Sequence, residues 1–215
     1  MDLKVSSVSL PGIETYIENK LESRKDIFKK AELLAKEINA PIVGPQVGNF
    51  LSLITKISSA TKVLELGSSI GYSTLWFADA VGEKGKVVYT DFDHKNAEIA
   101  KTLSEESKLL NRIDFYVGDA LEYVANTSEE FDIIFIDLDK SMYVEALEKS
   151  IPKLKVGGVL IADNTLWAGR VRWEQNDVNT KTINKYNKIV SSHSLLQTGI
   201  IPIRDGITIS YKTGN

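Results

Sequence analysis

Residues 62–73, KVLELGSSIGYS, decide the fold of this 215-residue chain. A short apolar run, Val63–Leu66, leads into a turn with two glycines four positions apart, Gly67 and Gly71, and an amphipathic segment follows. A strand, a tight turn and a helix in this order let the backbone approach a ligand at the start of the helix. The spacing is not Gly-x-Gly-x-x-Gly, so a dinucleotide is not the expected ligand. A plain strand-to-helix turn would also favour glycine, but we favour a cofactor site.

The same alternation of strand and helix continues to the C-terminus. The expected strands are Val63–Leu66, Val87–Thr90, Ile113–Val117, Ile133–Ile136, Val159–Ala162 and Ile207–Tyr211. The expected helices are Ser73–Val81, Lys95–Leu110, Ala120–Ala125, Met142–Leu154 and Thr180–Ser191. This pattern is typical of an α/β fold whose mostly parallel sheet is buried on both faces. Only Arg204-Asp205-Gly206 separates the apolar stretch 195–203 from the last strand, so this hairpin predicts one antiparallel strand.

Before the sheet, the pattern is helical up to about Ser59, with breaks at Pro41 and Pro45. We find no linker, internal repeat or low-complexity tract. The chain is therefore expected to be one domain, 1–215, in which residues 1–59 form a helical cap and residues 60–215 form the α/β core.

Composition excludes several classes of function. The chain has no cysteine, and its two histidines, His94 and His193, are not spaced as zinc ligands. The net charge is −3 and the pI is about 5.6, which argues against nucleic acid as a partner. We recognise neither a signal peptide nor an apolar run that could span a bilayer. A cytoplasmic protein without a membrane partner is expected.

Two acidic residues at strand ends are candidates for binding a nucleoside. Asp91 ends the second strand, 24 residues after Gly67, where a carboxylate can accept hydrogen bonds from both hydroxyls of a ribose. The alternative role of a helix cap is assigned to Asp93. Asp119 follows the third strand and could meet an adenine amino group, but it could equally be the N-cap of the helix that follows.

The fourth and fifth strands end in oxygen donors. Asp137 follows one strand, and Asp163 and Asn164 follow the other. Two carboxylates and an amide, without nitrogen or sulfur ligands, suit a hard cation such as Mg²⁺, Ca²⁺ or Mn²⁺. Asp163 and Asn164 can face one ion only if the strand has already ended, because neighbours within a strand point to opposite faces. Ordinary turn residues are the competing interpretation.

Taken together, these motifs resemble one family. The chain carries Glu-Leu-Gly-x-x-x-Gly-Tyr-Ser at residues 65–73, then an acidic residue, Gly-Asp-Ala at 118–120, Asp-x-x-Lys at 137–140, Asp-Asn at 163–164 and Asp-Gly at 205–206. This order is similar to that of the cation-dependent class I O-methyltransferases, which include catechol and caffeoyl-CoA O-methyltransferases and small bacterial relatives. The resemblance runs from about Pro41 to Lys212. It implies a Rossmann-like methyltransferase fold with a seven-stranded sheet.

The resemblance also implies a role for each matching residue. The cofactor, S-adenosylmethionine, would have its amino-acid end lined by Glu65, Gly67 and Ser73, with Val43 and Gly44 closing over it. Ser69 and Asp137 would also bind the cofactor. Asp91 would hold its ribose, and Asp119 and Ala120 its adenine. A divalent cation, Mg²⁺ first, would bind Asp137, Asp163 and Asn164. Lys140 would act in catalysis beside Asp137, as a general base; an ammonium that steers an anion and a simple surface lysine are the alternatives.

The implied reaction is methyl transfer to a small phenolic acceptor. A phenol has a pKa of about 10 and is mostly neutral at pH 7, so activation by a cation is needed. Animal catechol enzymes carry an acidic residue where this chain has Gly199 and an aromatic residue where it has Asp139, which argues against catechol itself. Trp167, Trp173 and Tyr143 are either walls for the acceptor ring or core residues.

Three other functions fit the sequence less well. An amine-directed nucleic-acid methyltransferase would carry a motif like Asn-Pro-Pro-Tyr after the fourth strand, and a nicotinamide oxidoreductase would have a different glycine spacing. A binding module would have little use for the metal ligands and Lys140.

A homodimer is expected from the family resemblance.

Overall fold

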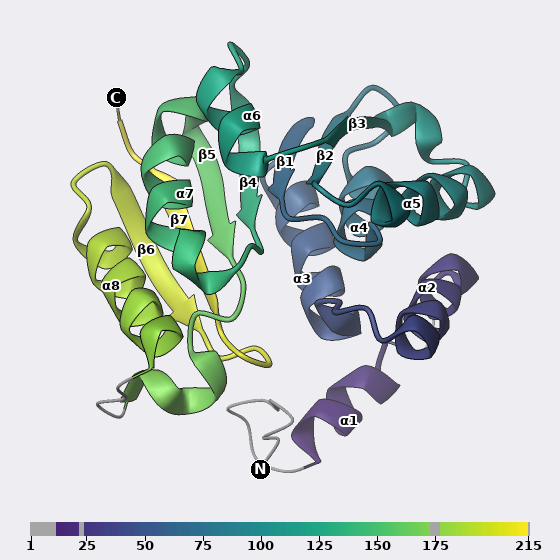
Figure 1. Ribbon diagram of the computed structural model, residues 1–215, viewed down its shortest axis with the longest axis horizontal. Coiled ribbons are helices and arrows are strands. Elements are labelled where there is room, and N and C mark those ends of the chain that lie inside the picture. The colour runs from purple at the N-terminus through teal and green to yellow at the C-terminus, as the bar shows by residue number, and fades with distance from the viewer. Residues whose placement is uncertain (1–11, 22–23, 173–176, 215) are drawn as a thin grey trace.

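The computed structural model describes residues 12–21, 24–172 and 177–214. Its centre is a seven-stranded sheet in the order β3-β2-β1-β4-β5-β7-β6 (Figure 1). The strands are β1 Lys62–Leu66, β2 Lys86–Asp91, β3 Ile113–Val117, β4 Phe131–Ile136, β5 Leu154–Ala162, β6 Leu196–Ile201 and β7 Ile207–Lys212. Strands β1 to β5 pair in parallel, and β7 runs antiparallel to both β5 and β6. The predicted mixed sheet with one antiparallel strand is confirmed.

Helices cover both faces of the sheet. They are α1 Ile13–Asn19, α2 Asp26–Ile38, α3 Gly44–Ile57, α4 Tyr72–Ala80, α5 His94–Glu106, α6 Ala120–Asn126, α7 Tyr143–Ser150 and α8 Val178–Ser192. One apolar core joins α3, α4 and α5 to the sheet, and a second core joins α6, α7 and α8 to its other face (Figure 1). Consecutive strand residues such as Val63 and Leu64 point into different cores, as the two-residue period of a strand requires.

Some predicted element bounds need correction. The helix expected over Met142–Leu154 is only α7, Tyr143–Ser150, and it is followed by a short 3₁₀ turn. Strand β5 begins at Leu154, well before the predicted Val159. Its first half carries Gly157, Gly158 and an exposed Val156, so the apolar pattern there is too weak to indicate a strand. The helix predicted to reach Leu110 ends at Glu106, and Leu110 begins a 3₁₀ turn.

The N-terminal helices position one wall of the site. Helix α3 packs against α4, and Gly48 on α3 leaves room for the indole of Trp76, because a Cβ at this position would collide with that ring. Phe28 of α2 stacks on the same indole with ring centroids 3.9 Å apart. This packing holds the start of α3 beside the end of β1. Among the helices in the described ranges, none is long and apolar enough to cross a membrane.

Candidate active site

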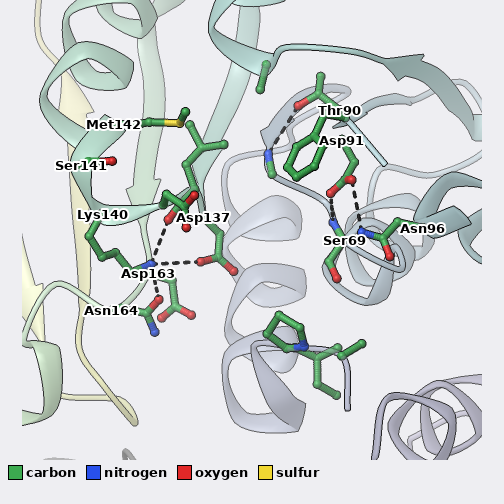
Figure 2. Close-up of a pocket in the computed structure, with 18 of the residues that line it drawn as sticks. Ser69, Thr90, Asp91, Asn96, Asp137, Lys140, Ser141, Met142, Asp163 and Asn164 are labelled. Atoms are coloured by element: carbon green, nitrogen blue, oxygen red, sulfur yellow. Dashed lines mark hydrogen bonds and ion pairs between the residues drawn. The ribbon is translucent and has the colours of Figure 1, made fainter. Parts of the chain in front are cut away.

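The carboxyl ends of the central strands open into a cavity of about 980 Å³. Figure 2 shows two groups of side chains on opposite sides of it: Ser69, Asp91 and Asn96 on one side, and Asp137, Lys140, Asp163 and Asn164 on the other. The predicted residues that line this cavity are Gly67, Ser69, Asp91, Asp119, Ala120, Asp137, Lys140, Asp163 and Asn164. Val43 and Ser73 line a smaller adjoining cavity. Parallel strands thus bring these residues to one edge of the sheet.

Asp91 organises the side of the cavity that suits a nucleoside. Its Oδ2 accepts a hydrogen bond from the backbone N–H of Ser69 (2.9 Å), and its Oδ1 accepts from the backbone N–H of Asp93 (2.8 Å) and from Nδ2 of Asn96 (3.2 Å). An ionised carboxylate has about four acceptor sites, so capacity is left for a ribose hydroxyl. Asp93 is the N-cap of α5, as predicted.

Two neighbours of Asp91 were not predicted as site residues. Asn96 lies on the first turn of α5 and contacts the Asp91 carboxylate. Phe92 follows Asp91, lines the cavity and is 81% exposed. Its position directly after the strand-end aspartate was a usable signal, because a large apolar side chain at the rim of a ligand site is available for stacking. Nothing in the local sequence pattern marks Asn96, which only the helix geometry brings back to Asp91.

Asp119 serves as a helix cap and also lines the cavity. Its Oδ1 accepts hydrogen bonds from the backbone N–H groups of Leu121 (2.7 Å) and Glu122 (3.2 Å), so it is the N-cap of α6. The two roles that the sequence left open are compatible, since the second carboxylate oxygen takes no part in the cap.

The turn after β1 shapes the amino-acid end of the predicted cofactor site. Gly67 has a φ of +87°, and a Cβ there would collide with the backbone carbonyl of Asp137. Glu65 is fully buried beneath this turn; its Oε2 accepts a hydrogen bond from Thr74, and its Oε1 has no partner among the described residues. Burial raises the pKa of Glu65 to about 7. A buried carboxylate oxygen without a partner fits the ammonium group of an amino acid.

The opposite side of the cavity carries two carboxylates. Asp163 directly follows β5 and is 4% exposed, and its Oδ1 has no hydrogen-bond partner in the described structure. Burial and the negative charge of Asp137 raise the pKa of Asp163 to about 7. Burial also raises the pKa of Asp137, against the opposing effect of the nearby Lys140. Asn164 has a φ of +55°, so the chain has left the strand and is turning, as the shared ion site requires.

These residues fit a divalent cation. The negative charge of Asp137 helps to raise the pKa of Asp163, and Oδ1 of Asp163 has no hydrogen-bond partner among the described residues. A hard cation would offset that charge and bind that oxygen, and Asp137, Asp163 and Asn164 offer the oxygen donors it prefers. In the described ranges there is no group of three or more His, Cys, Asp or Glu side chains that could hold a metal, so this set depends on the Asn164 amide for its third donor.

Lys140 has a complete set of hydrogen-bond acceptors. Its Nζ donates to Oδ1 of Asn164 (2.6 Å), to the hydroxyl of Tyr143 (2.7 Å) and to the carbonyl of Leu138 (3.1 Å), and it lies 3.5 Å from Oδ1 of Asp137. The side chain is only 10% exposed, so the surface-lysine alternative is wrong. Three donated hydrogen bonds require all three protons of an ammonium, which favours the electrostatic role over that of a base.

The three aromatic candidates differ in position. Trp167 lines the cavity, and Nζ of Lys140 lies 5.9 Å from the centroid of its ring. Tyr143 is fully buried and packs edge-on against Tyr186, with the ring centroids 5.4 Å apart. Tyr143 is therefore a core residue whose hydroxyl supports Lys140, and Trp167 is a wall of the site. Trp173 lies outside the described residues.

Comparison with known sequences decides the family. The model of a family described as O-methyltransferase matches residues 21–213. The chain belongs to this O-methyltransferase family. Caffeoyl-CoA O-methyltransferase 1 of Arabidopsis thaliana is 33% identical to it over 178 residues, 77% of this chain and 69% of that protein. The catechol O-methyltransferase of Niastella koreensis is 28% identical over 197 residues, 88% of this chain and 89% of that protein.

Solved structures support the same assignment. The O-methyltransferase from Bacillus cereus in complex with SAH has a TM-score of 0.85 and 26% identity, covering 94% of this chain and 97% of that one. The cofactor-bound protein Rv0187 from MTB has a TM-score of 0.88 and 26% identity, covering 96% and 99%. The prediction of an S-adenosylmethionine-dependent O-methyltransferase is therefore confirmed.

Proposed function

We propose that this O-methyltransferase methylates a hydroxyl of a small phenolic, catechol-like acceptor and requires a divalent cation, with Mg²⁺ preferred to Ca²⁺ or Mn²⁺. The supporting observation is that Asp137, Asp163 and Asn164 lie with Lys140 in the same cavity as Asp91. The names of the relatives, which include catechol and caffeoyl-CoA O-methyltransferases, favour the same acceptor class.

The cofactor would lie along the wall formed by β1 and β2. Asp91 would accept hydrogen bonds from its ribose, and Asp119 and Ala120 would border its adenine. Glu65 would accept from its ammonium group through the unpartnered Oε1. The remaining neighbours of the amino-acid end would be Val43, Gly44, Gly67, Ser69, Ser73 and Asp137.

Catalysis would combine alignment with charge stabilisation. When bound, S-adenosylmethionine supplies the methyl group, and the cation supplies Lewis-acid stabilisation of negative charge on the acceptor oxygen. Holding the two reactants in line can lower a barrier by about 7–11 kcal/mol. Asp137 lines both the main cavity and the smaller adjoining one, and it would fix the cation next to the cofactor. Lys140 would hold the Asn164 amide and stabilise the phenolate as an ammonium.

The acceptor site differs from that of animal catechol enzymes. Gly199, at the position of their acidic residue, lies within β6 and does not line the cavity. Asp139, at the position of their aromatic residue, lines the cavity and is exposed. Of the two aromatic candidates within the described residues, Trp167 lines the cavity and Tyr143 does not. We therefore propose that the natural acceptor is a catechol-like phenol other than catechol itself.

The proposal is tested with radiolabelled S-adenosylmethionine and a panel of catechol-bearing acceptors, with Mg²⁺ or with EDTA. Transfer should require the metal, and Asp163→Ala should abolish it. The matched control is Asp114→Ala, since Asp114 is an exposed aspartate paired with Lys86 on the far edge of the sheet. Methylation that persists in EDTA would contradict the metal role, and wild-type protein that binds no S-adenosylhomocysteine would contradict the cofactor site.

Two expectations from the sequence also stay proposals. The chain is proposed to form a homodimer, which sedimentation at micromolar concentration tests directly; a monomer would contradict it. A cytoplasmic location is proposed as well, and cell fractionation is its test.

A further inference from the structure

We infer that Arg204 is a positioning residue, which fastens the segment Ile42–Gly44 over the methionine end of the cofactor to the turn that supports the metal ligands. The inference rests on the proposed placement of the cofactor. Arg204 lies in the turn between β6 and β7, far in sequence from the start of α3. The sequence marked this turn as a hairpin connection and, at Asp205-Gly206, as part of the family resemblance, but it assigned no role to Arg204.

On one side, the turn is bound to the loop after Asn164. The backbone N–H of Thr165 donates to the carbonyl of Gly206 (2.9 Å), and the N–H of Leu166 donates to the carbonyl of Asp205 (2.9 Å). The backbone N–H of Ala168 donates to the carboxylate of Asp205. These bonds join the turn directly to the chain that leaves the metal ligands, so a shift of one would displace the other.

On the other side, the turn reaches the start of α3. Nη1 of Arg204 donates to the carbonyl of Val43 and lies 3.3 Å from the carbonyl of Ile42. Gly44 makes this approach possible, because a Cβ at that position would lie 2.6 Å from Nη1 of Arg204. Arg204 is thus the link between two segments that are 161 residues apart in the chain.

The segment that Arg204 holds covers one end of the site. Ile42 and Val43 line the smaller cavity together with Gly67, Ser73 and Asp137, where the methionine part of the cofactor is proposed to bind. Two hydrogen bonds from a charged donor are strong enough to fix such a segment. Arg204 also lines the main cavity, but through the segment that it holds it should slow the release of the cofactor and keep it aligned with the acceptor.

The experiment measures the Kd of S-adenosylhomocysteine by titration calorimetry for the full chain and its variants. Arg204→Ala should raise the Kd about tenfold or more, and Arg204→Lys should restore part of the affinity. Arg112→Ala is the matched control, because the Arg112 guanidinium also donates to a backbone carbonyl, that of Ala78 at 3.1 Å, away from the cavity. Its loss should lower the Tm and leave the Kd unchanged.

A double-mutant cycle gives a readout that a purely structural role would not produce. Gly44→Ala should displace the guanidinium and weaken binding. In the Arg204→Ala background it should cost clearly less, because the clash with the guanidinium is gone and only the strain of its φ of +75° and its proposed contact with the cofactor are left. Additive effects, or an unchanged Kd in Arg204→Ala, would overturn the inference. An unchanged Kd in Gly44→Ala would contradict the cofactor placement, and a wild-type chain that does not bind would contradict the cofactor site as a whole.

Discussion

Nζ of Lys140 lies 2.6 Å from Oδ1 of Asn164, although the two residues follow different strands of the sheet. The contact orients the Asn164 amide, the only neutral member of the proposed ligand set. It also uses one proton of the ammonium, and Tyr143 and Leu138 accept the other two. The lysine is thus built into the metal side of the site as a cation.

We expect the positive charge of Lys140 to matter more than proton removal. Lys140→Met should lower kcat by about 10²–10³, the effect of removing one preorganised charge-stabilising donor. Lys140→Arg should recover about tenfold of that loss or more, because arginine keeps the charge but cannot act as a base at neutral pH. Steady-state kinetics with a catechol-bearing acceptor and Mg²⁺ measure both. Equal inactivity of the two variants would favour the role of a base. Lys149→Met is the control, because Lys149 is a partly exposed lysine of α7 that pairs with Glu145.

Asp163→Asn should affect metal binding and stability in opposite directions. The affinity for Mg²⁺ or Mn²⁺ in calorimetry should fall at least about tenfold, because a charged ligand is lost. Burial raises the pKa of Asp163 to about 7, so its charged form destabilises the metal-free native state above that pH. The variant should therefore unfold at a higher temperature at pH 8, by about 2–4 °C for each kcal/mol relieved. Asp114→Asn is the control, because it makes the same substitution at an exposed aspartate. A lower Tm for Asp163→Asn than for wild type would contradict the predicted stabilisation.

Glu65 should make the cofactor-free protein less stable as the pH rises. Its pKa is about 7 in the folded state, against an ordinary value of 4.5. The native state therefore binds more protons, and the free energy of unfolding should fall between about pH 4.5 and 7. The fall in the free energy of unfolding is at most about 3–4 kcal/mol. Denaturant titrations of wild type and Glu65→Gln at several pH values test this, since the variant should lack that part of the slope. If the free energy of unfolding falls equally with pH in wild type and Glu65→Gln, Glu65 is not the source of the pH dependence.

Gly67 and Gly82 offer a matched pair of glycines. Both have a positive φ, +87° and +78°, but a Cβ at Gly67 would collide with the Asp137 carbonyl, and a Cβ at Gly82 would have nothing within 4 Å. Gly82→Ala should therefore lose only the conformational preference, about 1 kcal/mol, and bind S-adenosylhomocysteine normally. Gly67→Ala should be destabilised further and lose binding. Thermal denaturation measures the stability of the two variants, and calorimetry measures their affinity for S-adenosylhomocysteine. Similar stability and affinity in both variants would contradict the role of the Gly67 turn.

Much of the architecture was predictable from local patterns. The apolar runs at Val63–Leu66 and Ile133–Ile136 are buried on both faces of a parallel sheet, so each reads as a continuous strand. Glycines mark the turn after β1 because a left-handed backbone needs them there. Strand-end residues such as Asp91 and Asp163 were recognisable for a related reason: parallel strands place their carboxyl ends at one edge.

Other features depended on contacts between distant parts of the chain. The sequence alone left the roles of Lys140 and Tyr143 open, because the state of a buried polar group depends on which partners surround it. Arg204 carried no local signal, since its partner carbonyls at the start of α3 are brought to it only when the antiparallel strand β7 docks against β5. Hydrophobic periodicity and turn chemistry depend on a few neighbouring residues, so the strands, helices and turns that they produce can be predicted from the sequence. Burial, hydrogen-bond partners and shifted pKa values arise only after the sheet has assembled.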